Sequence, residues 1–280
     1  MDMNRNEATT VHLEPFLKWA GGKRWLVKSS TQIAPHAYKT YIEPFVGSGA
    51  VFFYLNPQKS IIADLNLDLV TVFKQLKRDW RSVESYLKQH HRLHSDDHYY
   101  KVRSSKPRVE HSKAARFIYL NRTCWNGLYR VNLKGEFNVP RGTKNSVIMP
   151  TDNYSAVAKR LRNCKILCQD FSKTISMADK DDFIFIDPPY TVNHNLNGFL
   201  KYNEKIFSWS DQLRLKDCIK NAIGRGVKIT MTNADHPSIR ALYRDIGETE
   251  ILIRNSKIAG ETRHRGLTSE ILIRFGWTAS

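Results

Sequence analysis

The chain has 280 residues, of which 41% are hydrophobic and 25% are charged, the balance of a folded globular protein. Hydrophobic residues are spread along the whole chain, which excludes disorder as its main state. Lys and Arg number 44 and Asp and Glu number 27, so the formal net charge is +17. This excess favours a polyanionic partner such as nucleic acid, although some proteins are basic without binding one.

The four cysteines contain no C-x-x-C pair and no zinc-site spacing. We therefore expect a reduced, cytoplasmic compartment. The N-terminal residues lack the apolar core of a signal peptide, and no run approaches the ~18 apolar residues that span a bilayer. A membrane is not an expected partner.

Five short, nearly continuous apolar runs predict buried parallel strands, and most of them end in a carboxylate or Asn. Helices are expected at 49–55 and 209–224, the second capped by Ser210 or Asp211. The alternation predicts an α/β fold with a doubly wound, Rossmann-like sheet. The predicted strands lie at 41–45, 60–64, 164–170, 182–190 and 227–233.

This alternation stops between about residues 65 and 160. Helices are predicted at 68–77 and 82–93, and the segment 121–142, with its Asn-Gly and Lys-Gly pairs, predicts a turn and a β-hairpin. We interpret residues 65–159 as an inserted helical and hairpin domain. The α/β domain then comprises residues 1–64 and 160–280.

Two late runs, EILIRN at 250–255 and EILIRF at 270–275, predict a hairpin-like pair that closes the sheet edge. We interpret the basic residues at and after the first run as a second surface for a nucleic-acid backbone, with an ordinary exposed loop as the alternative. These residues are Arg254, Lys257, Arg263, His264 and Arg265.

The segment EPFVGSGAVFF (43–53) runs from a strand through a glycine-rich turn into a helix. Gly47 and Gly49 would let a ligand approach the backbone closely, but Phe52 stands where a dinucleotide fingerprint has its third glycine. The pattern favours a nucleoside without phosphates, with a plain tight turn as an alternative of equal weight. Asp64, at the end of the next strand, is placed to bind ribose hydroxyls or to cap the following helix.

The tetrapeptide Asp187-Pro188-Pro189-Tyr190 directly follows the apolar strand FIFI. Two prolines fix the backbone, so a freed carbonyl and the Asp187 carboxylate form two acceptors that point at one place. An exocyclic amine such as adenine N6 needs this arrangement, because its lone pair is delocalised into the ring. Tyr190 offers a ring on which a flipped base could stack. A simple strand-ending loop is the weaker alternative.

Two glycines separate an aromatic residue from a lysine in FLKWAGGKR (16–24). Lys23 could meet a carboxylate, and Trp19 could cover an adenine or a methyl group, although an ordinary turn explains the segment alone. The series His90, His91, His94 and His98 is more typical of a solvated helix than of a metal site, so no metal is expected.

Five motifs, in this order, resemble the Dam-type (D12 class, alpha group) DNA adenine-N6 methyltransferases. The resemblance covers roughly residues 14–275. The long fourth motif is the most specific, because in that family it belongs to the target-recognition insert. The motifs are FLKWAGGK (16–23), EPFVGSGAVFF (43–53), ADLNLDL (63–69), NRTCWNGLYRVNLKGEFNVP (121–140) and FIDPPY (185–190).

The resemblance implies S-adenosylmethionine as the methyl donor, and the motif of Asp187 to Tyr190 as the catalytic motif that holds a flipped adenine. The family's cofactor contacts correspond here to Trp19, Lys23, Asp64 and Asp187. The residues that line or border the same pocket correspond to Glu43, Phe45, Gly47, Gly49, Asp170 and Phe171.

The resemblance also implies a DNA-reading surface. Lys18 corresponds to a lysine that touches the first guanine of the target. Trp125 stands where relatives, usually with tyrosine, wedge an aromatic ring into the base stack. The positions that read the site in members recognising GATC correspond to Asn126, Leu128, Arg130 and Pro140.

The chemistry of these side chains agrees with such a role. Arg130 can contact guanine O6 and N7 together, and Leu128 and Pro140 can touch a thymine methyl group. Three further cations are expected to contact phosphates and to position the duplex, namely Lys134, Arg141 and Lys144. Without the resemblance, a basic surface loop would be the preferred interpretation.

We therefore predict a site-specific adenine-N6 methyltransferase acting on duplex DNA by base flipping, at GATC. The implied source is a bacterium or a phage, and we expect a monomer. Two settings stay open: a stand-alone enzyme, and an enzyme that protects DNA from a cognate restriction endonuclease acting on the same site without a stable complex. Two alternatives remain at this point: an adenine-N6 methyltransferase acting on structured RNA, and a non-catalytic DNA-binding protein.

Overall fold

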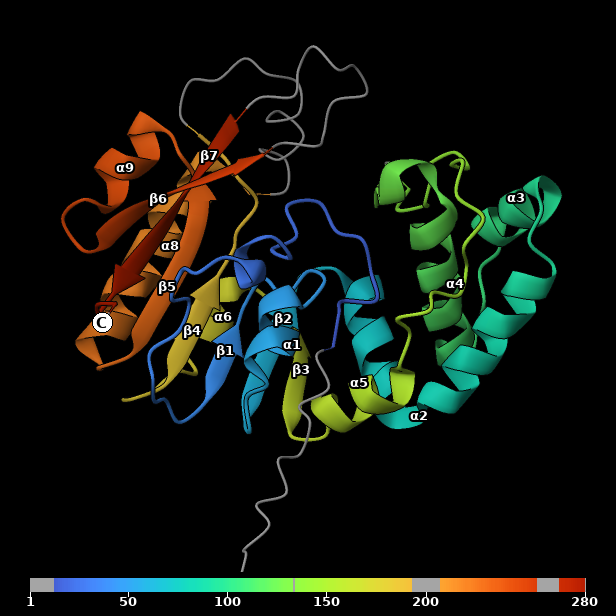
Figure 1. Ribbon diagram of the computed structural model, residues 1–280, viewed down its shortest axis with the longest axis horizontal. Helices are drawn as coiled ribbons and strands as arrows, with labels where there is room; N and C mark the ends of the chain where they lie inside the picture. The colour runs from blue at the N-terminus through green and yellow to red at the C-terminus, as the bar shows by residue number, and fades with distance from the viewer. Residues whose placement is uncertain (1–12, 133, 193–206, 256–266, 280) are drawn as a thin grey trace, which may run out of the picture.

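The structure is a computed structural model that describes residues 13–132, 134–192, 207–255 and 267–279. A seven-stranded sheet forms its centre, with the order β3-β2-β1-β4-β5-β7-β6 (Figure 1). The first five strands are parallel, and β7 runs antiparallel between β5 and β6. The strands are β1 (Tyr41–Glu43), β2 (Ser60–Asp64), β3 (Cys164–Cys168), β4 (Phe183–Ile186), β5 (Lys228–Ala234), β6 (Glu248–Asn255) and β7 (Leu267–Phe275).

Alternate residues of the central strands serve two cores, one on each face of the sheet. In β4, Phe183 and Phe185 join the core on one face, whereas Ile184 and Ile186 join the core on the other. Both faces of β4 are buried, which is why its sequence is a continuous apolar run without alternation. The predicted doubly wound α/β fold is confirmed.

Helices cover the two faces of the sheet. The short η1 (Leu26–Lys28), α1 (Ala50–Leu55) and α5 (Tyr154–Leu161) contribute to the first core. The second core is covered by α6 (Phe171–Ile175), α8 (Trp209–Gly224) and α9 (Pro237–Tyr243). The N-cap of α8 is Ser208 and not the expected Ser210 or Asp211, because Ser208 and Asp211 form a reciprocal capping box.

The helical region between β2 and β3 begins with α2 (Leu67–Arg92). This helix consists of two helical stretches that meet at Asp79, whose φ of −153° and ψ of 70° are not helical, so the two helices predicted at 68–77 and 82–93 are confirmed. The helices α3 (Asp96–Ser104) and α4 (Glu110–Thr123) and the short η2 (Trp125–Gly127) follow. Figure 1 shows α3 and α4 standing to one side of the sheet.

The hairpin predicted at 121–142 is only partly present in the described residues. Its first three residues belong to α4, and the rest pairs through two isolated bridges, Cys124 with Arg141 and Val131 with Phe137. By contrast, the predicted pair of late strands is confirmed, since β6 and β7 are antiparallel and β6 lies at the sheet edge. Four of the basic residues predicted to form a second surface lie outside the described residues, namely Lys257, Arg263, His264 and Arg265. None of the described helices is long and apolar enough to cross a membrane.

Candidate active site

A cavity of about 900 Å³ lies at the carboxyl ends of β1, β2 and β4. Parallel strands end at one edge of the sheet, so their terminal carboxylates gather there. Glu43, Asp64 and Asp187 come together in this way, and all three line the cavity. The other predicted residues in its wall are Trp19, Lys23, Phe45, Gly47, Leu128, Asp170, Phe171, Pro188, Pro189 and Tyr190. Gly49 caps the start of α1 just outside the wall.

The loop after β1 is held by Asp64. Its carboxylate accepts hydrogen bonds from the backbone N–H of Gly47 (3.2 Å) and of Asn66 (2.9 Å). Asn66, and not Asp64, caps α2, so the capping alternative for Asp64 is wrong. Gly47 has a φ of +48°, and a Cβ there would lie 2.8 Å from Cδ1 of Trp19. Trp19 can therefore reach the cavity only because residue 47 is glycine.

Trp19 forms one aromatic wall together with residues from the helical region. Its ring stacks on Tyr129, with the centroids 5.8 Å apart, and on Phe117, at 6.3 Å. Tyr129 in turn donates a hydrogen bond from its hydroxyl to Asp68 (2.8 Å). This wall joins the N-terminal segment to α2 and α4, which lie far from it in sequence.

Phe45 and Phe171 form a second aromatic wall, with stacked rings 5.4 Å apart. The guanidinium of Arg214 lies 4.1 Å from the Phe171 ring centroid and bonds Asp170 at 2.7 Å. That bond holds the pKa of Asp170 at about 2. Asp170 also caps α6, so its carboxylate is committed to Ser172 and Arg214. Sequence reasoning missed Arg214, whose i,i+3 partner Asp211 gave only a helix-surface signal.

Glu43 is buried at the floor of the cavity. Burial raises its pKa well above the usual range, although a hydrogen bond from the Tyr41 hydroxyl at 2.8 Å opposes the shift. Burial also raises the pKa of Asp64. A nucleoside offers hydroxyl and amino donors, and carboxylate oxygens can accept hydrogen bonds from both.

Asp187 lies in a compact polar cluster. The ammonium of Lys23 is 2.8 Å from its Oδ1, and the Thr232 hydroxyl donates to the same oxygen at 2.7 Å. Burial raises the pKa of Asp187, and Lys23 opposes that shift. Glu270 of β7 accepts the Tyr190 hydroxyl at 2.6 Å and lies 3.6 Å from Lys23. The predicted meeting of Lys23 with a carboxylate is present.

Thr232 and Glu270 were not expected from the sequence. Both belong to strands whose positions were predicted, but their proximity to Asp187 depends on β7 pairing with β5, where Ala234 stands opposite Glu270. The signal in the sequence was a Glu directly before the apolar run ILI of a predicted strand, and in the structure this Glu is buried.

The remaining predicted residues lie on or beside residues 124–145, named here the 124–145 segment. The backbone N–H of Lys18 bonds the side chain of Asn121, just before this segment, at 2.9 Å. Burial, and then the nearby Lys144, lower the pKa of Lys18. Trp125 is 52% exposed, and its backbone N–H donates a hydrogen bond to the carbonyl of Pro140 at 2.9 Å.

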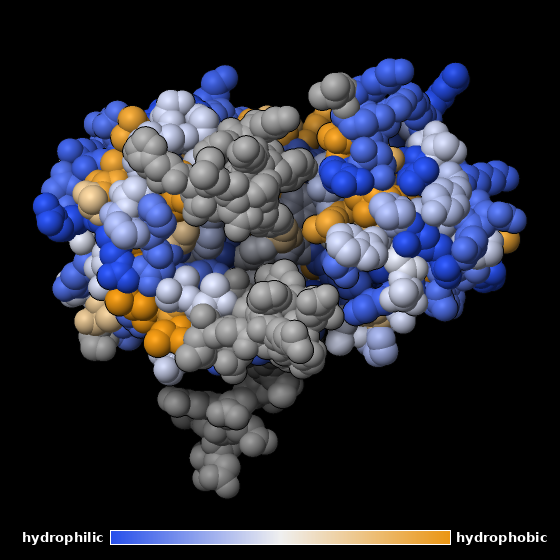
Figure 2. All heavy atoms as spheres, turned by 90° about the horizontal axis from the view of Figure 1, so that it is seen from above, coloured by the Kyte–Doolittle hydropathy of each residue, from blue (hydrophilic) through white to orange (hydrophobic). Residues whose placement is uncertain are grey.

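Hydrogen bonds hold the cations of the 124–145 segment at defined positions. The Nε of Arg130 donates to Asn138 at 2.9 Å, and Arg141 pairs with Asp96 at 2.6 Å. Asn126 has a left-handed φ of +54°, and Lys134 is exposed. Hydrophilic side chains predominate on the visible surface of this side of the molecule, interrupted by small hydrophobic patches (Figure 2). Of the predicted DNA-reading residues, only Leu128 lines the cavity.

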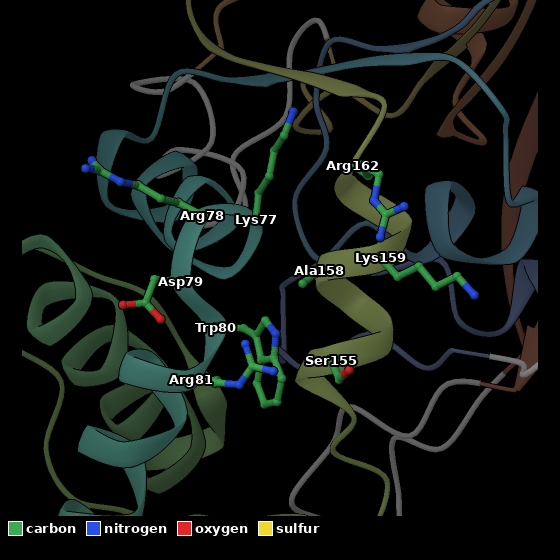
Figure 3. Close-up of a pocket in the computed structure, with 9 residues that line it drawn as sticks. All are labelled: Lys77, Arg78, Asp79, Trp80, Arg81, Ser155, Ala158, Lys159 and Arg162. Carbon is green, nitrogen blue, oxygen red and sulfur yellow. The ribbon is translucent and has the colours of Figure 1, made fainter.

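A second hollow, of about 400 Å³, lies between the kink of α2 and α5 (Figure 3). It is near the amino end of β3, since Lys77 bonds the carbonyl of Cys164 at 2.8 Å. Arg78 and Asp79 point away from α5, and the Arg81 guanidinium lies 4.8 Å over the ring of Trp80. Exposed cations dominate this hollow, so the convergent carboxylates of the larger cavity mark the candidate active site.

The histidine series does not form a solvated helix face. His90 is on α2 and His98 on α3, and their Nδ1 and Nε2 atoms lie 3.1 Å apart. His94 follows α2 and contacts the Tyr119 hydroxyl at 2.8 Å. Burial lowers the pKa of His90 to about 4. We interpret these residues as neutral packing between α2, α3 and α4.

Comparison with known proteins identifies the relatives of this chain. Residues 19–259 match the family of D12 class N6 adenine-specific DNA methyltransferases. A type II methyltransferase of Lactococcus lactis subsp. cremoris is 36% identical over 280 residues, covering 97% of this chain and 98% of the relative. Another, of Methanocaldococcus jannaschii, is 39% identical and covers 80% and 85%. The DNA adenine methylase of Haemophilus influenzae is 33% identical and covers 94% and 93%.

The family match spans the strand ends that carry Glu43, Asp64 and Asp187, and the 124–145 segment as well. The chain is a methyltransferase that belongs to the D12 class of N6 adenine-specific DNA methyltransferases.

Proposed function

We propose that the chain uses S-adenosylmethionine to methylate adenine N6 in duplex DNA at GATC, after flipping the adenine out of the helix. One observation carries this proposal: the Asp187 motif opens into the same cavity as Glu43 and Asp64. Acceptors for an adenine amine and acceptors for a nucleoside thus lie in one space. A cavity of about 900 Å³ is large enough for both groups.

The residues of the cavity fit the proposed cofactor. Carboxylates at the ends of β1 and β2 suit the amino and hydroxyl donors of an adenosine moiety, and the rings of Trp19, Phe45 and Phe171 suit its base. When bound, S-adenosylmethionine supplies an electrophilic methyl group. The chain supplies the acceptor geometry that makes adenine N6 nucleophilic.

The role proposed for Asp187 follows from its contacts. Lys23 and Thr232 fix one carboxylate oxygen, Oδ1, which leaves the other for a hydrogen of the adenine amine. Pro188 and Pro189 follow directly, so a carbonyl that is free of local N–H donors can accept the second hydrogen. Two acceptors favour a pyramidal nitrogen with its lone pair directed at the methyl group. The proton is lost after attack, so no strong general base is needed.

We infer that residues 65–159 form the target-recognition domain and that the 124–145 segment reads the site. Lys18, Lys134, Arg141 and Lys144 supply positive charge around it, which suits phosphate contacts. Arg130 is oriented by Asn138 and suits a guanine edge. In the proposed site, Asn126, Leu128 and Pro140 contact the remaining bases, and Trp125, largely exposed, enters the base stack.

The type II names of two relatives suggest a biological setting. We propose that the chain protects DNA from a restriction endonuclease that acts on the same site, without a stable complex between the two. A monomer suits an enzyme that flips one base in each event.

The test is modified-base sequencing of plasmid DNA from a methylation-deficient host that expresses the chain, with Asp187→Ala as the matched control. N6-methyladenine confined to GATC in the wild type, and absent in the control, is the expected result. Methylation at another sequence would refute the roles given to Asn126, Leu128, Arg130 and Pro140. Methylation of structured RNA but not of duplex DNA would refute the proposed substrate.

A further inference from the structure

The polar cluster around Asp187 contains a residue that comes from the far end of the chain. Glu270 lies in β7, only 3% exposed, and β7 is wedged antiparallel between β5 and β6. Its carboxylate oxygen Oε2 accepts the Tyr190 hydroxyl at 2.6 Å and lies 3.6 Å from the ammonium of Lys23. Through these two neighbours, Glu270 reaches both ends of the catalytic motif.

Lys23 connects the same residues from another direction. It is 3% exposed, pairs with Asp187 at 2.8 Å and lies 5.0 Å from the centroid of the Tyr190 ring. The carboxylates of Asp187 (side chain 18% exposed) and Glu270 (5% exposed) thus share one ammonium, and Asp187 is the closer of the two. A buried ion pair usually adds little to stability, because removing the charges from water costs free energy. Stability alone therefore does not explain the buried carboxylate of Glu270.

We propose that Glu270 is a positioning residue for methyl transfer: it fixes the Tyr190 ring through its hydroxyl and holds Lys23 against Asp187. The proposal rests on the proposed function. A tyrosine ring that stacks on a flipped base must keep one orientation while the base enters, and an anchored hydroxyl limits its rotation. The second contact keeps the ammonium in line with the Asp187 oxygen that Thr232 also holds.

Glu270 itself lies outside the cavity that would hold the cofactor. It is not part of the cavity wall, whereas Tyr190, Lys23 and Asp187 are. Its removal should therefore lower kcat more than it weakens binding of S-adenosylmethionine. We expect Glu270→Ala to lower kcat about 10- to 100-fold, with less than about a threefold change in the Kd of the cofactor.

The decisive measurement is a double-mutant cycle on kcat with Glu270→Ala, Tyr190→Phe and the double variant. If Glu270 acts through the Tyr190 hydroxyl, the two effects overlap, and the double variant is about as slow as the slower single variant. Fully multiplying effects would overturn the proposal. Glu250→Ala is the matched control, because Glu250 also lies in the β6–β7 hairpin and pairs with Arg274 at 2.7 Å, away from the cavity. It should lower thermal stability without lowering kcat.

A milder variant keeps the proposal testable if Glu270→Ala does not fold. Glu270→Gln retains an oxygen that can accept the Tyr190 hydroxyl but removes a negative charge near Asp187. We expect kcat within about threefold of the wild type at neutral pH, and an acid limb of the kcat profile that moves to lower pH, because a like charge no longer opposes ionisation of Asp187. A drop in kcat of tenfold or more in Glu270→Gln, which keeps the acceptor for the Tyr190 hydroxyl, would overturn the proposal, whereas absence of DNA methylation by the wild type would refute the proposed function instead.

Discussion

The cavity and the 124–145 segment are built in contrasting ways. The cavity takes its side chains from the ends of parallel strands, and its key groups are buried, as Lys23 is at 3% exposure. The described part of the 124–145 segment has two isolated bridges and presents Trp125 at 52% exposure. Chemistry on an amine requires groups fixed within fractions of an ångström, which strand ends provide. Reading a duplex requires side chains that extend into a groove, which an exposed segment provides.

Removal of the Asp187 carboxylate should have the largest effect, because it acts at the chemical step. We expect Asp187→Ala to lower the methylation rate about a thousandfold or more, equivalent to about 4 kcal/mol of transition-state stabilisation. Radioactive methyl transfer to a duplex measures the rate, and circular dichroism checks the fold. A rate near that of the wild type would show that the cavity does not carry the chemistry.

A methyl group placed at residue 47 should damage cofactor binding and leave DNA reading intact. In Gly47→Ala the new Cβ would collide with the Trp19 ring, so we expect the Kd of S-adenosylmethionine to rise at least tenfold, or about 1.4 kcal/mol. Isothermal calorimetry measures it. Gly226→Ala is the control, because Gly226 also has a positive φ and lies outside the cavity wall, and the atom nearest its Cβ belongs to the flexible Lys180 side chain at 3.2 Å. Equal effects of the two variants would mean that backbone strain, not the collision, is responsible.

In the 124–145 segment, two cations should separate specificity from affinity. Loss of Arg130 should cost about 1–3 kcal/mol in binding and relax the choice of one base in the site. Loss of Lys134 should weaken binding to all duplexes alike and reduce the slope of log K against log salt by about one. Competition titrations with single-base variants of the site, over a salt series, distinguish the two. An Arg130→Ala variant that keeps full discrimination would contradict base reading by this residue.

The smallest effect is a pH dependence of folding stability that arises from His90 in the helical region. Burial depresses the pKa of His90 from about 6.5 to about 4, so the folded chain favours the neutral ring. Its contribution to stability is complete above pH 6.5 and is lost as pH falls from 6.5 towards 4. Allowing for solvent screening, this loss is about 1–2 kcal/mol.

Urea denaturation at several pH values tests this dependence. His90→Gln should flatten the decline between pH 6.5 and 4, whereas the exposed His91→Gln should not. A steep decline that persists in the His90 variant would assign the pH dependence to other groups.

The same contrast explains how much could be predicted from the sequence. Strands such as β4 could be located because a strand that is buried on both faces has a continuous apolar sequence. The non-helical Asp79 lies in the gap between the two helices predicted at 68–77 and 82–93, so the break in α2 was predicted as well. The sequence does contain the capping-box pattern of α8, a Ser at 208 followed three residues later by Asp211. Ser210 was predicted instead because it lies closer to the apolar residues of the helix.

The site was predictable where one strand end carries the residue, as with Asp64 and Asp187. Glu270 and Thr232 could not be assigned, because their approach to Asp187 depends on the pairing of β5 with β7. Arg214 was not predicted for a similar reason. Its contact with Asp170 joins α8 to the residues after β3, and the two residues are 44 positions apart in the sequence. Local patterns carry no information about such meetings.

The placement of the helices between β2 and β3 also bears on how the chain folds. These neighbouring strands pair along five residues, from Ser60 with Cys164 to Asp64 with Cys168, yet roughly 100 residues separate them. Closing so long a loop from an unfolded chain is slow, since entropy must be lost before any contact compensates for it. The helices α2 and α4, which pack closely together within this stretch, can fold first and shorten the effective loop. Residues 65–159, which we propose form the target-recognition domain, would then also set the rate at which the sheet is completed.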